Sequence, residues 1–174
     1  IGVLLPLSGR YAAFGKRVQR GMELALEAFR PQIPVRFIFR DTTGDETVAA
    51  QQVAELAISD RVLGIAGPLV GNAAQGAARR AHQERTPLLT MSQKEGLAAS
   101  SLYTFRNSLT PQLQVRALLD YAMEERNFYQ FGIMSPQTRQ GEQLAELFRA
   151  EVLRRGGEVI AEESYLTDQT DFRY

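Results

Sequence analysis

Histidine and cysteine, the side chains that most often act as bases, nucleophiles and zinc ligands, are almost missing from this sequence. His82 is its single histidine, and it contains no cysteine. A Ser-His-Asp arrangement would have to use His82, and no G-x-S-x-G turn is present to hold the serine. His82 lies in an arginine-rich helical stretch, which favours a solvated helix residue over a catalytic base. The sequence therefore predicts a protein that is not an enzyme.

Metal and phosphate motifs are also missing. One histidine without cysteine cannot build the usual zinc sites, and Asp41, Asp45 and Glu46 do not have the spacing of a calcium loop. Helix capping and loop solvation explain these acids better. The glycine-rich run 64–71 follows an expected strand, but it departs from G-x-G-x-x-G, and Pro68 offers no N–H to a phosphate. We expect neither a metal nor a cofactor.

The composition is that of a globular protein with a substantial core. Of the 174 residues, 44% are hydrophobic, and 20 Lys and Arg balance 20 Asp and Glu. Zero net charge argues against a nucleic-acid partner. The longest apolar runs, such as residues 1–7, are strand-sized and far below the roughly 20 residues of a membrane span.

Short apolar runs rich in β-branched residues alternate with segments of helical period. The expected strands are residues 2–5, 35–39, 62–66, 87–91, 103–105, 131–134 and 158–165. The expected helices include residues 14–29, 72–84 and 141–155, a helix begun by a capping box of Thr43 with Glu46, and one begun by Thr110 and Pro111. This alternation predicts an α/β fold with a parallel sheet and helices on both faces. Ligands of such sheets bind at the carboxyl ends of the strands.

The first loop and several later positions resemble the type I periplasmic-binding proteins. The opening run 5–15, Leu-Pro-Leu-Ser-Gly-Arg-Tyr-Ala-Ala-Phe-Gly, is followed by Gly-Met-Glu-Leu-Ala at 21–25. Further matches follow in order: Asp41-Thr42, Gly67-Pro68, Thr86 to Leu89, Phe105-Arg106, Gly156-Gly157, Tyr165 and Asp171-Phe172. More narrowly, the pattern looks like the amino-acid receptor branch of ABC importers.

The resemblance implies a two-lobed fold with parallel sheets flanked by helices. Residues 1–108 would form lobe one as five βα units, and residues 109–174 would form part of an incomplete lobe two. The chain would cross between the lobes near residues 107–111, which would act as a hinge. Because a complete receptor of this kind crosses three times, the sequence is expected to be part of a longer protein.

The same resemblance implies a non-enzymatic, extracytoplasmic receptor that holds an amino-acid or amide-like solute between its lobes and delivers it to a membrane permease. Where the family uses hydroxyl or aromatic side chains, this sequence has Val70-Gly71-Asn72, Ser92-Gln93-Lys94 and Gln140-Gly141. Backbone N–H groups at a helix start, or the charge of Lys94, would then hold an anionic group instead. The implied ligand contacts are Ser8, Tyr11, Gly71, Asn72, Ser92, Gln93, Lys94, Arg106, Arg139 and Gln140.

Two alternatives stay open. Leu4 to Gly9, Asp41-Thr42 and Gly67-Pro68-Leu69 also resemble the outer-membrane lipoproteins that activate penicillin-binding proteins, in which a partner protein rather than a small solute would be bound. Some of the implied contacts also have purely structural explanations. Tyr11 and Phe14 would staple the first helix, Ser8 would belong to a tight turn, and Arg106 would pair with strand-end carbonyls or a nearby carboxylate.

Overall fold

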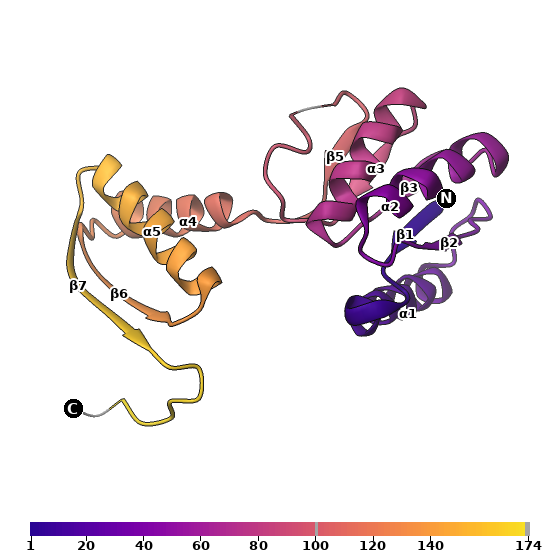
Figure 1. Cartoon of the computed structure of the whole chain (residues 1–174). Helices are drawn as coiled ribbons and strands as arrows, with labels where there is room; N and C mark the ends of the chain where they lie inside the picture. The colour runs from indigo at the N-terminus through magenta and orange to yellow at the C-terminus, as the bar shows by residue number, and fades with distance from the viewer. Residues whose placement is uncertain (100, 173–174) are drawn as a thin grey trace. The chain divides into compact units, whose positions relative to one another are not determined.

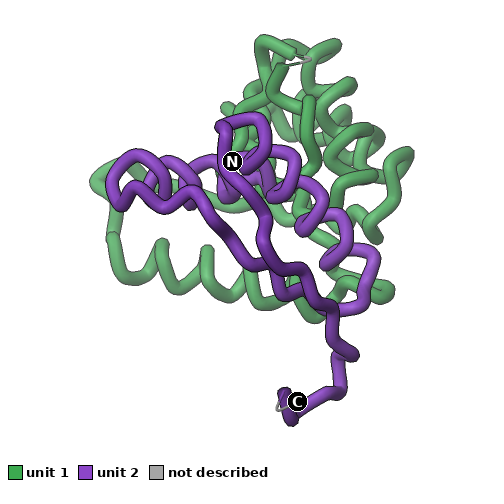
Figure 2. The backbone as a smooth tube through the Cα atoms, turned by 90° about the vertical axis from the view of Figure 1, so that its left-hand side faces the viewer, with its two compact units in different colours: residues 1–108 green, residues 109–174 purple. Residues whose placement is uncertain are grey.

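The computed structural model describes residues 1–99 and 101–172. These residues form two compact units, Ile1–Ser108 (unit 1) and Leu109–Tyr174 (unit 2), coloured separately in Figure 2. Among the described residues, no helix has the length and apolar character needed to cross a membrane.

Unit 1 contains a five-stranded sheet in which every pair of neighbouring strands is parallel. The strands are β1 (Gly2–Leu5), β2 (Ile38–Asp41), β3 (Ile65–Ala66), β4 (Leu88–Thr90) and β5 (Thr104–Arg106). Their order is β2-β1-β3-β4-β5. The predicted parallel sheet is therefore confirmed. The predicted strand 35–39 starts three residues before β2, because the parallel register with β1 begins only at Ile38, opposite Gly2.

Three helices cover the two faces of this sheet. Helix α1 (Ala12–Phe29) lies on one face, and α2 (Glu46–Ala54) and α3 (Gly71–Gln83) lie together on the other (Figure 1). A π-helical turn, η2 (Glu55–Ser59), continues α2. Strand β4 leads into an irregular segment instead of a helix, and Gly96 adopts a left-handed φ of 79° there. Within the described residues of unit 1, a helix follows β1, β2 and β3 but neither β4 nor β5, so the five βα units expected for residues 1–108 are reduced to three.

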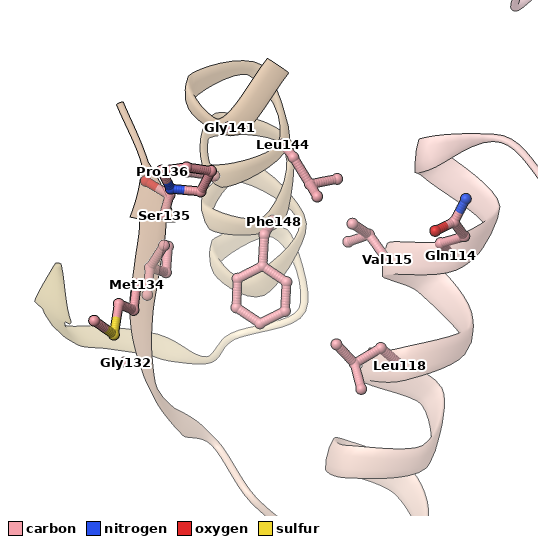
Figure 3. Close-up of a pocket in the computed structure, with 12 residues that line it drawn as sticks. Gln114, Val115, Leu118, Gly132, Met134, Ser135, Pro136, Gly141, Leu144 and Phe148 are labelled. Atoms are coloured by element: carbon pink, nitrogen blue, oxygen red, sulfur yellow. The ribbon is translucent and has the colours of Figure 1, made fainter. Parts of the chain in front are cut away.

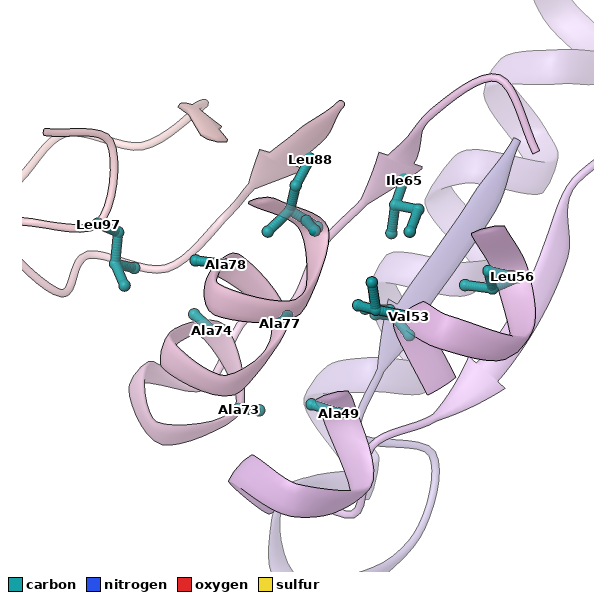
Figure 4. Packing of buried hydrophobic residues seen from close by; sticks show 12 residues of the cluster. Ala49, Val53, Leu56, Ile65, Ala73, Ala74, Ala77, Ala78, Leu88 and Leu97 are labelled. Carbon is teal, nitrogen blue, oxygen red and sulfur yellow. The ribbon is translucent and has the colours of Figure 1, made fainter. Parts of the chain in front are cut away.

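The core of unit 1 lies between the sheet and the α2–α3 layer (Figure 4). Small residues of α3 let the two helices approach closely. A Cβ added to Gly76 would lie 2.1 Å from the carbonyl oxygen of Glu46 on α2. The buried residues of this core are Leu4, Ala49, Val53, Leu56, Ile65, Ala73, Ala74, Ala77, Ala78, Ala81, Leu88 and Leu97.

The start of α2 corrects a prediction. Asp45, and not Thr43, caps the helix, since its carboxylate accepts the N–H groups of Thr47 (2.7 Å) and Val48 (3.0 Å). Thr43 has a left-handed φ of 51°, which lies outside the extended conformation of an N-cap residue. The helix therefore starts two residues later than predicted, with Asp45 satisfying its orphan donors, and the capping box of Thr43 with Glu46 does not form.

Unit 2 is a β-α-β arrangement preceded by a helix. Its elements are α4 (Pro111–Leu119), a π-helical turn η3 (Asp120–Glu125), β6 (Gln130–Pro136), α5 (Arg139–Arg154) and β7 (Glu158–Tyr165). The two strands are parallel. The predicted cap of α4 is confirmed, because the Thr110 hydroxyl accepts the N–H of Leu113 (3.3 Å) and proline follows at the first helical position.

Both units dock their first βα helix in the same way. In unit 1, β1 runs into Pro6, and a Cβ added to Gly15 of α1 would lie 2.1 Å from the carbonyl oxygen of that proline. In unit 2, β6 ends at Pro136, and the corresponding distance from Gly141 of α5 is 2.2 Å. Each glycine therefore lets a helix pack directly on the end of the preceding strand.

A network of ion pairs lies at the C-terminal end of α5. The carboxylate of Glu151 accepts hydrogen bonds from Arg154 (2.8 Å) and Arg155 (3.1 Å), and Arg155 also pairs with Asp120 of η3. The Arg154 hydrogen bond is the largest cause of a lowered pKa at Glu151. Burial raises the pKa of Glu151, whereas the Arg155 hydrogen bond and the charges of both arginines lower it further. The net result is a pKa of about 2.

This network predicts acid sensitivity of unit 2. A carboxyl group whose pKa is lowered by folding contributes stability above its ordinary pKa of 4.5 and loses it as the pH falls toward 2. We expect Glu151→Gln to be less stable than the natural protein at pH 7, with the difference shrinking between pH 4.5 and 2. Thermal unfolding across this range measures it. A difference that stays constant down to pH 2 would show that ionised Glu151 adds no stability.

Candidate functional site

The candidate site is the carboxyl edge of the unit 1 sheet. Because all five strands are parallel, the segments that follow them begin at the same edge. Seven of the ten residues implied as ligand contacts lie in these segments, and an eighth, Arg106, is the last residue of β5; the seven are Ser8, Tyr11, Gly71, Asn72, Ser92, Gln93 and Lys94.

The loop after β1 is held by the end of β2. The Asp41 carboxylate accepts the N–H groups of Leu7 and Thr43, each at 2.8 Å. Burial raises the pKa of Asp41, but hydrogen bonds from the Ser8 hydroxyl and from backbone N–H groups outweigh it and hold the pKa below its ordinary value. Gly9 has a left-handed φ of 70°. These contacts support the tight-turn interpretation of Ser8.

Tyr11 ends a short 3₁₀ turn, η1 (Gly9–Tyr11), and lies against the loop after β2. A Cβ added to Gly44 would lie 3.0 Å from the Tyr11 ring and 3.9 Å from Val70, which precedes α3. The guanidinium of Arg10 lies 4.4 Å from the ring centroid. Phe14 is 60% exposed and therefore does not staple the helix. The half-buried Tyr11 ring gives this edge of the sheet an aromatic surface.

The start of α3 meets the loop after β4. Val70, the residue before the helix, provides no side-chain cap, and the first turn has no acidic residue. Gly71 lies beside that loop: a Cβ added to it would be 3.4 Å from Lys94 Cβ and 3.8 Å from Ser92 Oγ. Lys94 Nζ donates a hydrogen bond to the side-chain oxygen of Gln75, one turn along α3. A helix N-terminus and an ammonium group are thus brought together, and both favour an anion.

Arg106 and Gln93 differ in their surroundings. The Arg106 side chain is 16% exposed and pairs with Glu95 at 3.6 Å, and its Nε is buried without a partner. The carboxylate pairing considered for Arg106 is therefore present in the structure. Gln93 is exposed.

Arg139 and Gln140 lie in the first turn of α5, in unit 2, and both are exposed. The hydroxyl of Thr138 caps this helix by accepting the N–H of Gly141 (3.0 Å). The sequence did not single out Thr138, although a threonine before an amphipathic helix is an ordinary cap signal. Whether Arg139 and Gln140 contact a ligand stays a prediction.

Unit 2 also contains an apolar cavity of about 390 Å³ between α4, β6 and α5 (Figure 3). Val115, Leu118, Met134, Leu144 and Phe148 contribute to its wall, and none of its lining residues is charged. It offers no ionic anchor for a polar solute, in contrast to the unit 1 edge.

Sequence reasoning missed two side chains of this edge. Arg10 covers Tyr11, and Gln75 holds the Lys94 ammonium. No local motif marks either residue, because the contact of Gln75 spans 19 positions and depends on the packing of α3. Within residues 1–99 and 101–172, no group of three or more His, Cys, Asp or Glu residues could hold a metal ion.

Comparisons with solved structures identify relatives of this architecture. A putative branched-chain amino-acid ABC transporter protein from Rhodospirillum rubrum is 24% identical, with a TM-score of 0.81 over 99% of this chain and 51% of that one. LivJ, a branched-chain amino-acid transporter substrate-binding protein from Streptococcus pneumoniae in complex with isoleucine, is 21% identical, with a TM-score of 0.63 over 99% and 51%.

A solute-binding protein of an ABC transporter from Rhodopseudomonas palustris, in complex with 3,4-dihydroxybenzoic acid, is 22% identical, with a TM-score of 0.70 over 98% of this chain and 48% of that one. The chain thus spans about half the length of these structures. The comparison with curated proteins returned no match.

A family model described as periplasmic binding protein matches residues 1–173. This match covers both units and confirms the resemblance that begins at the loop after β1. The chain belongs to the periplasmic binding protein family.

Proposed function

We propose that the protein is an extracytoplasmic, non-enzymatic solute receptor of an ABC importer, with a membrane permease as its partner. Residues 1–108 serve as lobe one and residues 109–174 as part of lobe two. The carboxyl edge of the unit 1 sheet binds a small amino-acid or amide-like solute. The observation that carries this proposal is the meeting of Lys94 with the uncapped start of α3 at Gly71.

The charges of the edge support an anionic group on the solute. Three acidic side chains at this edge already have partners within the protein. Asp41 accepts backbone N–H groups, Glu95 pairs with Arg106, and Asp45 caps α2. Lys94, in contrast, has a neutral amide as its hydrogen-bond partner. An incoming carboxylate would therefore meet a cation and helix N–H groups without competing carboxylates.

The relatives bound to ligands agree with this chemistry. Isoleucine is bound to the Streptococcus pneumoniae protein and 3,4-dihydroxybenzoic acid to the Rhodopseudomonas palustris protein. Both ligands carry a carboxylate. Tyr11, half-buried near Val70, offers a flat apolar contact for the remainder of either molecule.

A solute screen tests the proposal. We expect at least one of isoleucine, a primary amide such as leucinamide, or 3,4-dihydroxybenzoate to raise the unfolding temperature. A ligand at a hundredfold excess over its Kd adds about 2.7 kcal/mol to the free energy of unfolding. Since the family's hydroxyls are replaced at 70–72 and 92–94, isoleucine should be a weak ligand. No stabilisation of the intact two-lobed protein by any amino acid, amide or carboxylate would overturn the receptor proposal in favour of the peptidoglycan-synthase activator.

A further inference from the structure

Ser92 has surroundings that differ from those of a ligand contact. It is 1% exposed, and all three of its polar groups hydrogen bond within the protein. Its N–H donates to the Thr90 hydroxyl (3.2 Å), its hydroxyl accepts the N–H of Lys94 (3.2 Å), and its carbonyl accepts the Ser108 hydroxyl (2.8 Å).

These bonds continue across the sheet edge. The Thr90 hydroxyl donates to the carbonyl of Pro68, after β3 (3.3 Å), and the carbonyl of Thr90 accepts the N–H of Asn107, after β5 (2.8 Å). The hydroxyl groups of Thr90, Ser92 and Ser108 each bond to backbone groups, and together these bonds, here called the hydroxyl chain, join the segments following β3, β4 and β5.

We propose that Ser92 and Ser108 are positioning residues, and that the hydroxyl chain fixes the loop of Lys94 against the start of α3. The role of Lys94 as a ligand group rests on the function proposed above. Among the described residues no helix follows β4 directly, and Gly96 takes a left-handed conformation in this segment. Ser108 is also the last residue of unit 1, so the loop is tied to the point where the chain leaves that unit.

The first test removes the Ser108 hydroxyl in the full chain without ligand. We expect Ser108→Ala to speed hydrogen exchange of the Lys94 amide by about fivefold to tenfold, the effect of one lost hydrogen bond. Ser108→Thr, which keeps the hydroxyl, should restore slow exchange. Ser101→Ala is the matched control, because the Ser101 hydroxyl accepts the N–H of Tyr103 (3.1 Å) before β5, away from the site edge.

Ser92→Ala is the second variant and removes the direct acceptor of the Lys94 amide. It should speed exchange at Lys94 as well, including where Ser108→Ala fails to fold. The proposal is overturned if Ser108→Ala leaves the exchange of Lys94 unchanged, if threonine does not restore it, or if Ser101→Ala speeds it equally. All these measurements use the ligand-free protein. A failed solute screen would therefore overturn the receptor function and leave this result intact.

Discussion

Replacing Gly15 with alanine is expected to lower the free energy of unfolding by about 3 kcal/mol, at the upper end of the cost of overpacking a core. The new Cβ would lie 2.1 Å from the Pro6 carbonyl oxygen and 2.8 Å from the Pro6 carbonyl carbon. Both are backbone atoms at the end of β1, so the clash cannot be relieved by a side-chain rotation. Helix α1 would have to move away from the strand, and the loop that carries Ser8 and Tyr11 would move with it.

Gly21→Ala on the same helix is the matched control. Apart from the local backbone of its own helix, nothing lies within 4 Å of a Cβ added to Gly21. This substitution should stabilise the protein by about 0.5–1 kcal/mol, the usual gain of alanine over glycine inside a helix. Urea unfolding of both variants measures the two effects. Equal changes for Gly15→Ala and Gly21→Ala would show that the close approach to Pro6 has no energetic role.

The features that local sequence patterns could predict were those set by short-range chemistry. The parallel sheet follows from alternating strand and helix periods, and the Thr110 cap follows from a hydroxyl directly before proline. Boundaries set by pairing with another strand were less predictable, as the shift of β2 shows. Thr43 and Asp45 could both cap a helix from sequence, and the left-handed backbone at Thr43 decides between them.

The site was only partly predictable from the sequence, because it also depends on contacts between residues that are far apart in the chain. The resemblance placed Gly71, Ser92 and Lys94 in loops of one sheet edge, which the structure brings together. It did not distinguish a buried, fully hydrogen-bonded Ser92 from an exposed Lys94, because burial depends on how the segments after β3, β4 and β5 pack. The Ser108 contact with Ser92 spans 16 positions and has no local signal.

Replacing Lys94 with methionine is expected to weaken the binding of a carboxylate solute by about tenfold to a hundredfold, the effect of losing a hydrogen bond to a charged group. Methionine keeps much of the length of the side chain, so its contact with Gly71 is largely retained. Lys16→Met, on exposed α1, should leave the affinity unchanged and is the matched control. Calorimetry with the strongest solute of the screen measures both variants. Equal affinities of Lys94→Met and the natural protein would show that Lys94 does not contribute to solute binding.

The most direct measurement of solute binding at the unit 1 edge uses the lysines themselves, because Lys16 and Lys94 are the two lysines of the sequence. Reductive methylation with ¹³C keeps both positive charges and gives each side chain its own NMR signal. Titration with isoleucine or 3,4-dihydroxybenzoate should move the Lys94 signal to saturation and leave the Lys16 signal in place. A solute that binds by calorimetry while the Lys94 signal stays fixed would contradict the proposed site.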